Sequence, residues 1–168
     1  MRLRTLSCII LACGILLWSG LGSQAQTAQF EFNGHKKDSN VSFNGLQCRI
    51  SLNGNSNIGG IYELQKGTLI ISANGESQLE IKGECDKVVI ESLNGQSLVD
   101  LSKLKVGKSG VLIKDINGQS KLLLDSEGPI EVKSANGKSE IRFKKKASGP
   151  KLIRGSIKGD AKLIHEDK

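Results

Sequence analysis

Histidine is scarce in this sequence of 168 residues, which contains only His35 and His165, near opposite ends of the chain. A Ser-His-Asp triad needs a histidine placed between two polar partners. A zinc site needs closely spaced ligand pairs, and Cys48, Cys85 and His35 supply none. The sequence therefore gives no basis for either chemistry, and we expect no catalytic residue, no metal and no cofactor.

Aromatic residues make up only 4% of the chain. Beyond residue 25 they are Phe30, Phe32, Phe43, Tyr62 and Phe143. Proteins that bind single-stranded nucleic acid stack the bases on aromatic side chains, so we do not expect nucleic acid as a partner. Apolar residues beyond residue 25 also lack the 3.6-residue spacing of an amphipathic helix. We therefore expect an all-β protein.

The first 25 residues have the order of a secretory signal. Arg2 and Arg4 precede an apolar run from residue 8 to 17, and Ser23-Gln24-Ala25 offers small residues for a peptidase. The apolar run is short for a membrane-spanning helix, which favours cleavage after Ala25 over a retained anchor. A lipoprotein-type cut before Cys13 is a third alternative. The sequence thus predicts a signal peptide over 1–25 and an exported protein, periplasmic, on the cell surface or secreted.

Two of the four cysteines, Cys48 and Cys85, lie outside the predicted signal. An oxidising compartment would let a disulfide between them persist. They are separated by a little less than two of the repeats described next, so they could bridge nearby coils. The alternative is that they are two small buried residues in separate coils.

The dipeptide Asn-Gly recurs along the chain, and this repeat predicts the fold. From Asn53 the steps are 21, 20, 23 and 19 residues. A serine follows each of the later asparagines three positions on, and a last copy carries Lys158-Gly159 and Ala161 instead. Copies of the dipeptide start at Asn44, Asn53, Asn74, Asn94, Asn117 and Asn136.

Apolar residues alternate with mostly polar ones on both sides of each Asn-Gly, as in Leu79/Ile81 and Val88/Ile90. Such short alternating runs are typical of half-buried strands. Asn-Gly also favours hairpins, so a meander or sandwich is an alternative. A constant long period instead favours stacked coils. We predict a right-handed β-solenoid of about five to six coils of roughly 20 residues each, spanning 41–165 behind an N-terminal cap segment, 26–40.

Stacking would place equivalent residues about 4.8 Å apart along the solenoid axis. We therefore expect two structural ladders at the turns. The asparagine ladder would comprise Asn74, Asn94, Asn117 and Asn136. The serine ladder would comprise Ser77, Ser97, Ser120 and Ser139.

Positive charge is concentrated at the C-terminal end. Residues 133–168 contain 11 basic and 4 acidic residues, a net charge of +7, whereas residues 26–132 contain 11 basic and 13 acidic, a net charge of −2. Lysines on a terminal coil can discourage end-to-end stacking. They could also bind an acidic glycan, an anionic lipid surface or another envelope protein. The candidate anion-binding residues are Lys144, Lys145, Lys146, Lys151, Arg154 and Lys158.

The repeated pattern Asn-Gly-x-Ser-x-apolar-x-apolar resembles that of short exported β-solenoids of the adhesin type, the head-domain GIN family. The stretch from Leu79 to Ile90 is also similar to secreted solenoid domains with Gly-x-Cys-x-x-Val-x-Val repeats. The resemblance covers roughly residues 40–165 and implies a fold and an extracytoplasmic location, without any catalytic residue.

Two function classes follow from this reading. The first is a non-catalytic exported module for surface interaction, adhesion or envelope structure. The second is a carbohydrate-active β-helix enzyme, a polysaccharide lyase or hydrolase acting on acidic glycans. Such enzymes need several acidic residues on one face, whereas Asp100, Asp115 and Asp125 occupy three different phases of the repeat. We therefore favour the non-catalytic module.

Overall fold

A computed structural model describes residues 9–10, 27–33, 39–43, 45–63, 67–144 and 152–166. Within these ranges the protein is all-β. The predicted signal peptide, apart from Ile9–Ile10, lies outside the described residues. The strands are β1 (Ile9–Ile10), β2 (Thr27–Asn33), β3 (Ser39–Phe43), β4 (Gln47–Asn53), β5 (Asn57–Glu63), β6 (Thr68–Ala73), β7 (Gln78–Leu93), β8 (Leu98–Ile113), β9 (Lys121–Ser126), β10 (Ile130–Ala135), β11 (Glu140–Lys144), β12 (Leu152–Ile157) and β13 (Lys162–Glu166).

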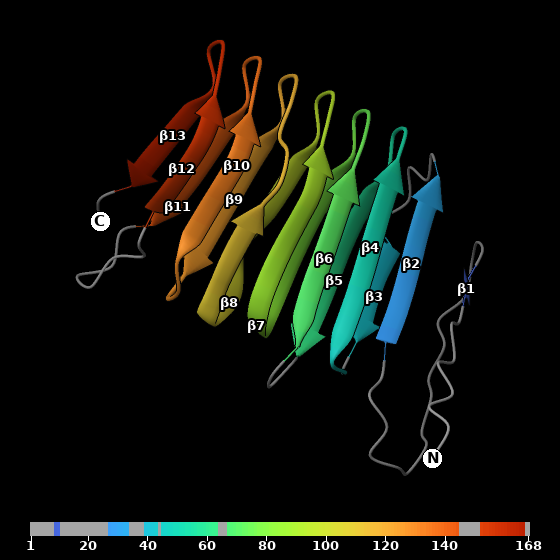
Figure 1. Ribbon diagram of the computed structural model, residues 1–168. Coiled ribbons are helices and arrows are strands. Elements are labelled where there is room, and N and C mark those ends of the chain that lie inside the picture. The colour runs from blue at the N-terminus through green and yellow to red at the C-terminus, as the bar shows by residue number, and fades with distance from the viewer. Residues whose placement is uncertain are drawn as a thin grey trace, which may run out of the picture.

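The strands form two stacked layers that face each other across the core (Figure 1). Strands that precede an Asn-Gly corner lie in one layer, and strands that follow it lie in the other. The long strands β7 and β8 start in the second layer and bend back into the first. Every pairing between the named strands is parallel. The predicted β-solenoid is therefore confirmed, and the hairpin meander is excluded because it would pair antiparallel strands.

The solenoid makes about five turns. In Figure 1 the strands before each corner rise in the front layer, the strands after it descend behind, and the coils advance from β2 towards β13. This path is a right-handed winding, the hand favoured by parallel crossover connections. The best-packed turns lie between β4 and β11, since the buried core cluster extends from Cys48 to Phe143.

Alternate residues of each strand point into the space between the layers. In β4 the inward residues Cys48, Ile50 and Leu52 are at most 1% exposed, and the residues between them are partly exposed. Each inward residue lies in register with its equivalent one coil on; Ile50 pairs with Ile71, and Ile71 with Ile90. Like therefore stacks on like, which explains why the same residue type recurs at the same phase of the repeat.

The uneven coil length is absorbed away from the Asn-Gly corners. The longest step, between Asn94 and Asn117, contains a register shift between Leu101 and Val106 in the pairing of β8 with β9. A second irregularity places Ser72 opposite Ser92, so Glu91 is an extra residue in β7. The corners themselves stay in phase despite these insertions.

Part of the predicted N-terminal cap segment, 26–40, is described as strand β2 and the start of β3. All seven residues of β2 pair in register with β4. Its inward residues Phe30 and Phe32 pack against the core while remaining partly exposed. In the part of the chain that the structure describes, no helix is long and apolar enough to cross a membrane.

Candidate functional site

The Asn-Gly corner is the most regular surface feature, and its glycine is required for two reasons. Gly75 and Gly95 have φ of 82° and 79°, in the left-handed region that side chains disfavour. A Cβ on Gly95 would also lie 2.7 Å from the carbonyl oxygen of Gly75, directly beneath it in the stack. That oxygen accepts a hydrogen bond from the amide of Gln96 at 2.8 Å. Close stacking of backbone on backbone therefore excludes a side chain at this position.

The asparagine side chains form a hydrogen-bonded column at these corners. Each amide nitrogen donates to the amide oxygen of the asparagine one coil earlier. The Nδ2–Oδ1 distances are 3.0 Å for Asn53–Asn33, 3.2 Å for Asn74–Asn53, 2.9 Å for Asn94–Asn74 and 3.2 Å for Asn117–Asn94. The ladder thus links five coils and begins further towards the N-terminus than the sequence interpretation placed it.

The ladder departs from the prediction at both of its ends. Asn136 stacks over Asn117 through its backbone, whose amide donates to Ile116 at 2.8 Å, but its side chain donates to Ser134 Oγ at 3.1 Å. It is therefore in the column without joining the amide chain. At the other end Asn33, which sequence reasoning missed, accepts from Asn53. The sequence pattern could have identified Asn33, because it is also followed by glycine and precedes Asn53 by 20 residues.

The serines support the corner from inside the core. Ser77 and Ser97 are at most 1% exposed, and each hydroxyl donates to the carbonyl oxygen of the asparagine three residues earlier at 2.9 Å. Ser56 and Ser120 make the same bond. Ser77 and Ser97 also approach the carbonyl oxygens of Gly54 and Gly75 one coil earlier, at 3.1 Å and 3.4 Å, so the serines connect each corner to the one beneath it. Ser139 is equally buried, and its hydroxyl has no hydrogen-bond partner in the described structure.

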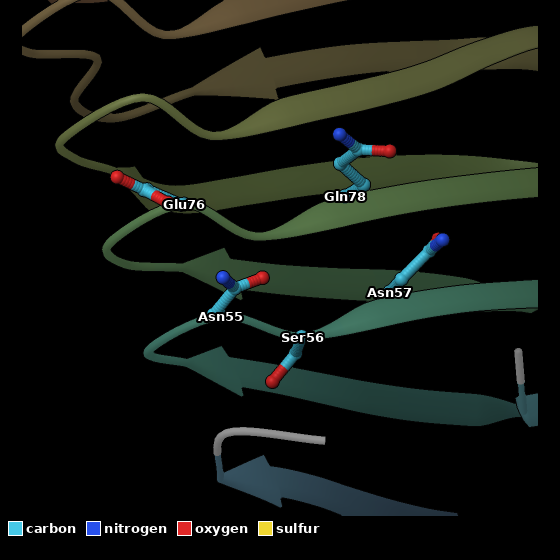
Figure 2. Close-up of a pocket in the computed structure, with 5 residues that line it drawn as sticks. All are labelled: Asn55, Ser56, Asn57, Glu76 and Gln78. Atoms are coloured by element: carbon cyan, nitrogen blue, oxygen red, sulfur yellow. The ribbon is translucent and has the colours of Figure 1, made fainter. Parts of the chain in front are cut away.

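An open polar hollow lies beside two successive corners (Figure 2). It is lined by Asn55, Ser56, Asn57, Glu76 and Gln78. Asn57 of β5 and Gln78 of β7 lie in register, and both are exposed. Amide side chains at adjacent coils can donate to and accept from hydroxyl groups. Glu76 is the only carboxylate among these five lining residues, whereas glycoside hydrolysis uses two.

Charged side chains on the outer surface connect neighbouring coils. Arg49 holds the Glu91 carboxylate with both guanidinium ends, one of them Nη2 at 3.3 Å from Oε1. Lys114 Nζ approaches the same oxygen at 3.4 Å. The hydrogen bond from Arg49, together with the two positive charges, lowers the pKa of Glu91 against a smaller opposing effect of burial. Glu91 is thus a carboxylate that holds coils together.

The structure describes only some of the cationic residues predicted to bind anions near the C-terminus. Arg154 in β12 and Lys158 at the last corner are exposed. Lys145, Lys146 and Lys151 lie outside the described residues, and of Lys144 only the backbone, in β11, is described. The structure therefore brings Arg154 and Lys158 to one end of the solenoid and leaves the rest of the anion-binding prediction untested.

The two cysteines occupy different columns. Cys48 pairs in register with Leu69, and Cys85 with Val106. Both side chains are buried, and the two cysteines are not joined by a disulfide. Burial, aided by the charge of Asp86, raises the pKa of Cys85 to about 12. Since the thiolate is the reactive form, Cys85 is a packing residue in this structure.

Several described acidic side chains are engaged in local contacts with neighbouring residues. Glu80 pairs with Lys103 at 2.7 Å, Asp86 accepts from Ser109 at 2.8 Å, and Asp100 accepts from the amide of Ser102 at 2.9 Å. Within the described ranges, no group of three or more histidine, cysteine, aspartate or glutamate residues could hold a metal ion. The acidic residues are thus dispersed along the stack.

Comparison with known proteins adds no family assignment: no protein-family model, no curated protein and no solved structure matches this chain.

Proposed function

We propose that this protein is an exported, non-catalytic β-solenoid of the adhesin type, which serves surface interaction or envelope structure as a rigid module. The observation that carries the proposal is that many polar side chains of the described residues bond to other parts of the solenoid. The corner amides bond to one another, the serine hydroxyls bond to corner carbonyls, and Glu91 and Glu80 bond to cations of other coils. This chemistry stabilises a straight stack with a fixed spacing of outward side chains.

The partner-binding surface in this proposal is the basic C-terminal end. Arg154 and Lys158 are exposed there, in the part of the chain that has a net charge of +7. Clustered cations raise the local concentration of an acidic partner and speed its association. An acidic glycan, an anionic lipid surface or an acidic envelope protein would each supply the complementary charge.

Binding to heparin and to vesicles with and without anionic lipid, over a series of salt concentrations, tests this function. We expect retention on the anionic matrices that falls as salt rises. Replacing Lys144, Lys145 and Lys146 by glutamate should abolish it. Replacing the exposed Lys82, Lys105 and Lys108 by glutamate changes net charge equally and should leave most of it. Equal loss in both triple variants would contradict a localised site.

An activity assay addresses the enzymatic alternative. The purified chain would be incubated with acidic polysaccharides, with and without calcium, and the products followed by size. We expect no turnover. Cleavage that disappears on substitution of Asp100, Asp115 or Asp125 would overturn the non-catalytic proposal.

A further inference from the structure

Asn136 is held differently from the other corner asparagines. At Asn74 and Asn94 the amide is fixed at both ends, since the nitrogen donates to the preceding asparagine and the oxygen accepts from the following one. Among the described residues, the Asn136 amide donates only to Ser134, two residues earlier. The residue above it is Lys158, whose backbone amide donates to Ala135 at 2.8 Å. No asparagine is therefore present in the last coil to continue the ladder.

An asparagine followed by glycine can close a five-membered ring on its own backbone. The amide nitrogen of the glycine loses its proton and bonds to the asparagine Cγ, and the Cγ–Nδ2 bond breaks with release of ammonia. Water then adds to one carbonyl of the succinimide and opens the ring to aspartate or isoaspartate. Glycine permits this closure because it has no side chain to hinder it. The asparagine side chain must turn towards the backbone, so hydrogen bonds that hold its amide slow the reaction.

The local charges at Asn136 also favour this reaction. Lys138 follows Gly137 in the sequence, and Lys158 lies one coil above Asn136; both are exposed. Positive charge favours deprotonation of the glycine amide and stabilises the oxyanion formed at Cγ. The carboxylate that results would then lie near cations. At Asn117, by contrast, the carboxylate of Asp115 is a direct partner of the amide nitrogen, and its charge opposes an anion there.

Within the ladder the product itself is unfavourable. The Asn94 nitrogen donates to Asn74 Oδ1 at 2.9 Å. An aspartate at position 94 would place an oxygen where that nitrogen lies, so two acceptors would face each other. Hydrogen bonds to the neighbouring coils would therefore disfavour both the rotation of the Asn94 side chain towards the backbone and the negative charge of the aspartate product.

We propose that Asn136–Gly137 is a site of spontaneous deamidation, and that the amide ladder protects Asn74 and Asn94 from the same reaction. Deamidation at Asn136 adds one negative charge to the basic end of the solenoid. The site therefore offers a time-dependent change in the charge of that end, independent of whether the end binds an anionic partner.

The test is peptide mapping by mass spectrometry, with isoaspartate quantified at each Asn-Gly, after incubation of the folded chain at neutral pH and 37 °C. We expect Asn136 to deamidate faster than Asn74 and Asn94 by on the order of tenfold, the effect of one or two additional hydrogen bonds. The differences should vanish in concentrated guanidinium chloride, where every corner is unfolded. Equal rates in the folded chain would overturn the proposal.

Two variants separate the corner from bulk charge. Lys158→Asn restores an amide above Asn136 and removes the cation, and it should slow deamidation at Asn136. Lys162→Asn removes an equal charge from the same coil at an exposed position after the corner, and it should have little effect. Equal slowing by both variants would mean that net charge, and not the column, sets the rate, which would also overturn the proposal.

Discussion

The imidazole ring of His165 packs edge-on against the phenyl ring of Phe143, with 4.0 Å between ring centroids and 64° between ring planes. Phe143 is 1% exposed and belongs to the core column that runs through Leu124. In the other layer Arg154 lies in register over the buried Val132. The last coil thus replaces two apolar core positions by residues that are polar and exposed. These residues finish the stack at its C-terminal end.

This arrangement predicts that Arg154 and His165 prevent two copies of the protein from associating through their C-terminal coils. Among the described strands β12 pairs only with β10 and β13 only with β11, so both have a free edge. Free edges invite pairing with another chain, but a coil added here would bury the charge of Arg154 without a partner, which is costly. The double substitution Arg154→Val with His165→Phe should therefore cause concentration-dependent association, measured by light scattering after size-exclusion chromatography.

A matched variant shows whether position matters. Lys121→Val also replaces a cation by an apolar residue, but on the exposed outer side of β9 in the middle of the stack. It should remain in the same oligomeric state as the unmodified protein. Association of both variants to the same extent would argue for general stickiness rather than for an uncapped end.

The corner glycines predict a large loss of stability for a very small substitution. Gly95→Ala places a side chain at positive φ, which costs about 1–3 kcal/mol, and brings its Cβ to 2.7 Å from the Gly75 carbonyl oxygen. We expect the free energy of unfolding in urea to fall by roughly 3 kcal/mol or more. The exposed neighbour Gln96→Ala should change it by less than about 0.5 kcal/mol. Similar values for the two would refute the close-stacked corner.

The sequence predicted the columns because stacking imposes the same demand on every coil. Asn74, Asn94 and Asn117 recur for this reason, and so do the inward residues Leu79 and Val99. The sequence interpretation missed the start of the ladder because Asn44-Gly45 lies between Asn33 and Asn53. This extra dipeptide interrupts the interval of about 20 residues that separates equivalent asparagines. An Asn-Gly dipeptide alone does not show whether it lies at a corner of the coil. Its position in the coil is determined by the pairing of its strand with the next coil.

Contacts between different columns could not be predicted from the repeat. The Arg49–Glu91 pair joins residues 42 positions apart and depends on Glu91 being the extra residue of β7. Likewise, Arg154 falls in a core column only because β12 keeps the register of β10. The positions of Glu91 and Arg154 depend on an inserted residue and on a degenerate copy of the repeat. The alternation of apolar and polar residues does not specify them.

The Glu91 cluster predicts a specific acid dependence of stability. Because the folded-state pKa of Glu91 is lowered, mainly by the Arg49 hydrogen bond, its contribution is fully present above the unfolded-state pKa. It is lost as the pH falls through the folded-state pKa. Glu91→Gln should therefore lower the free energy of unfolding at pH 7 and have much less effect at strongly acidic pH. Urea unfolding over a pH series measures both, with the exposed Glu84→Gln in the same strand as the control. An effect of Glu91→Gln that is the same at every pH would show that the ion pair does not stabilise the fold.

The buried thiol of Cys85 predicts a modification rate that reports on unfolding. Its pKa of about 12 leaves very little thiolate at pH 8, and its side chain is 4% exposed. Iodoacetamide reacts with the thiolate, so alkylation of the folded chain should be slow and should proceed through opening of the solenoid. Gly95→Ala should accelerate it by lowering the cost of opening, if opening is rapid relative to alkylation. A cysteine placed at exposed Lys105 provides the fast reference. Rapid labelling of Cys85 in the unmodified folded chain, at a rate near that of the reference, would mean that this part of the core is open to solvent.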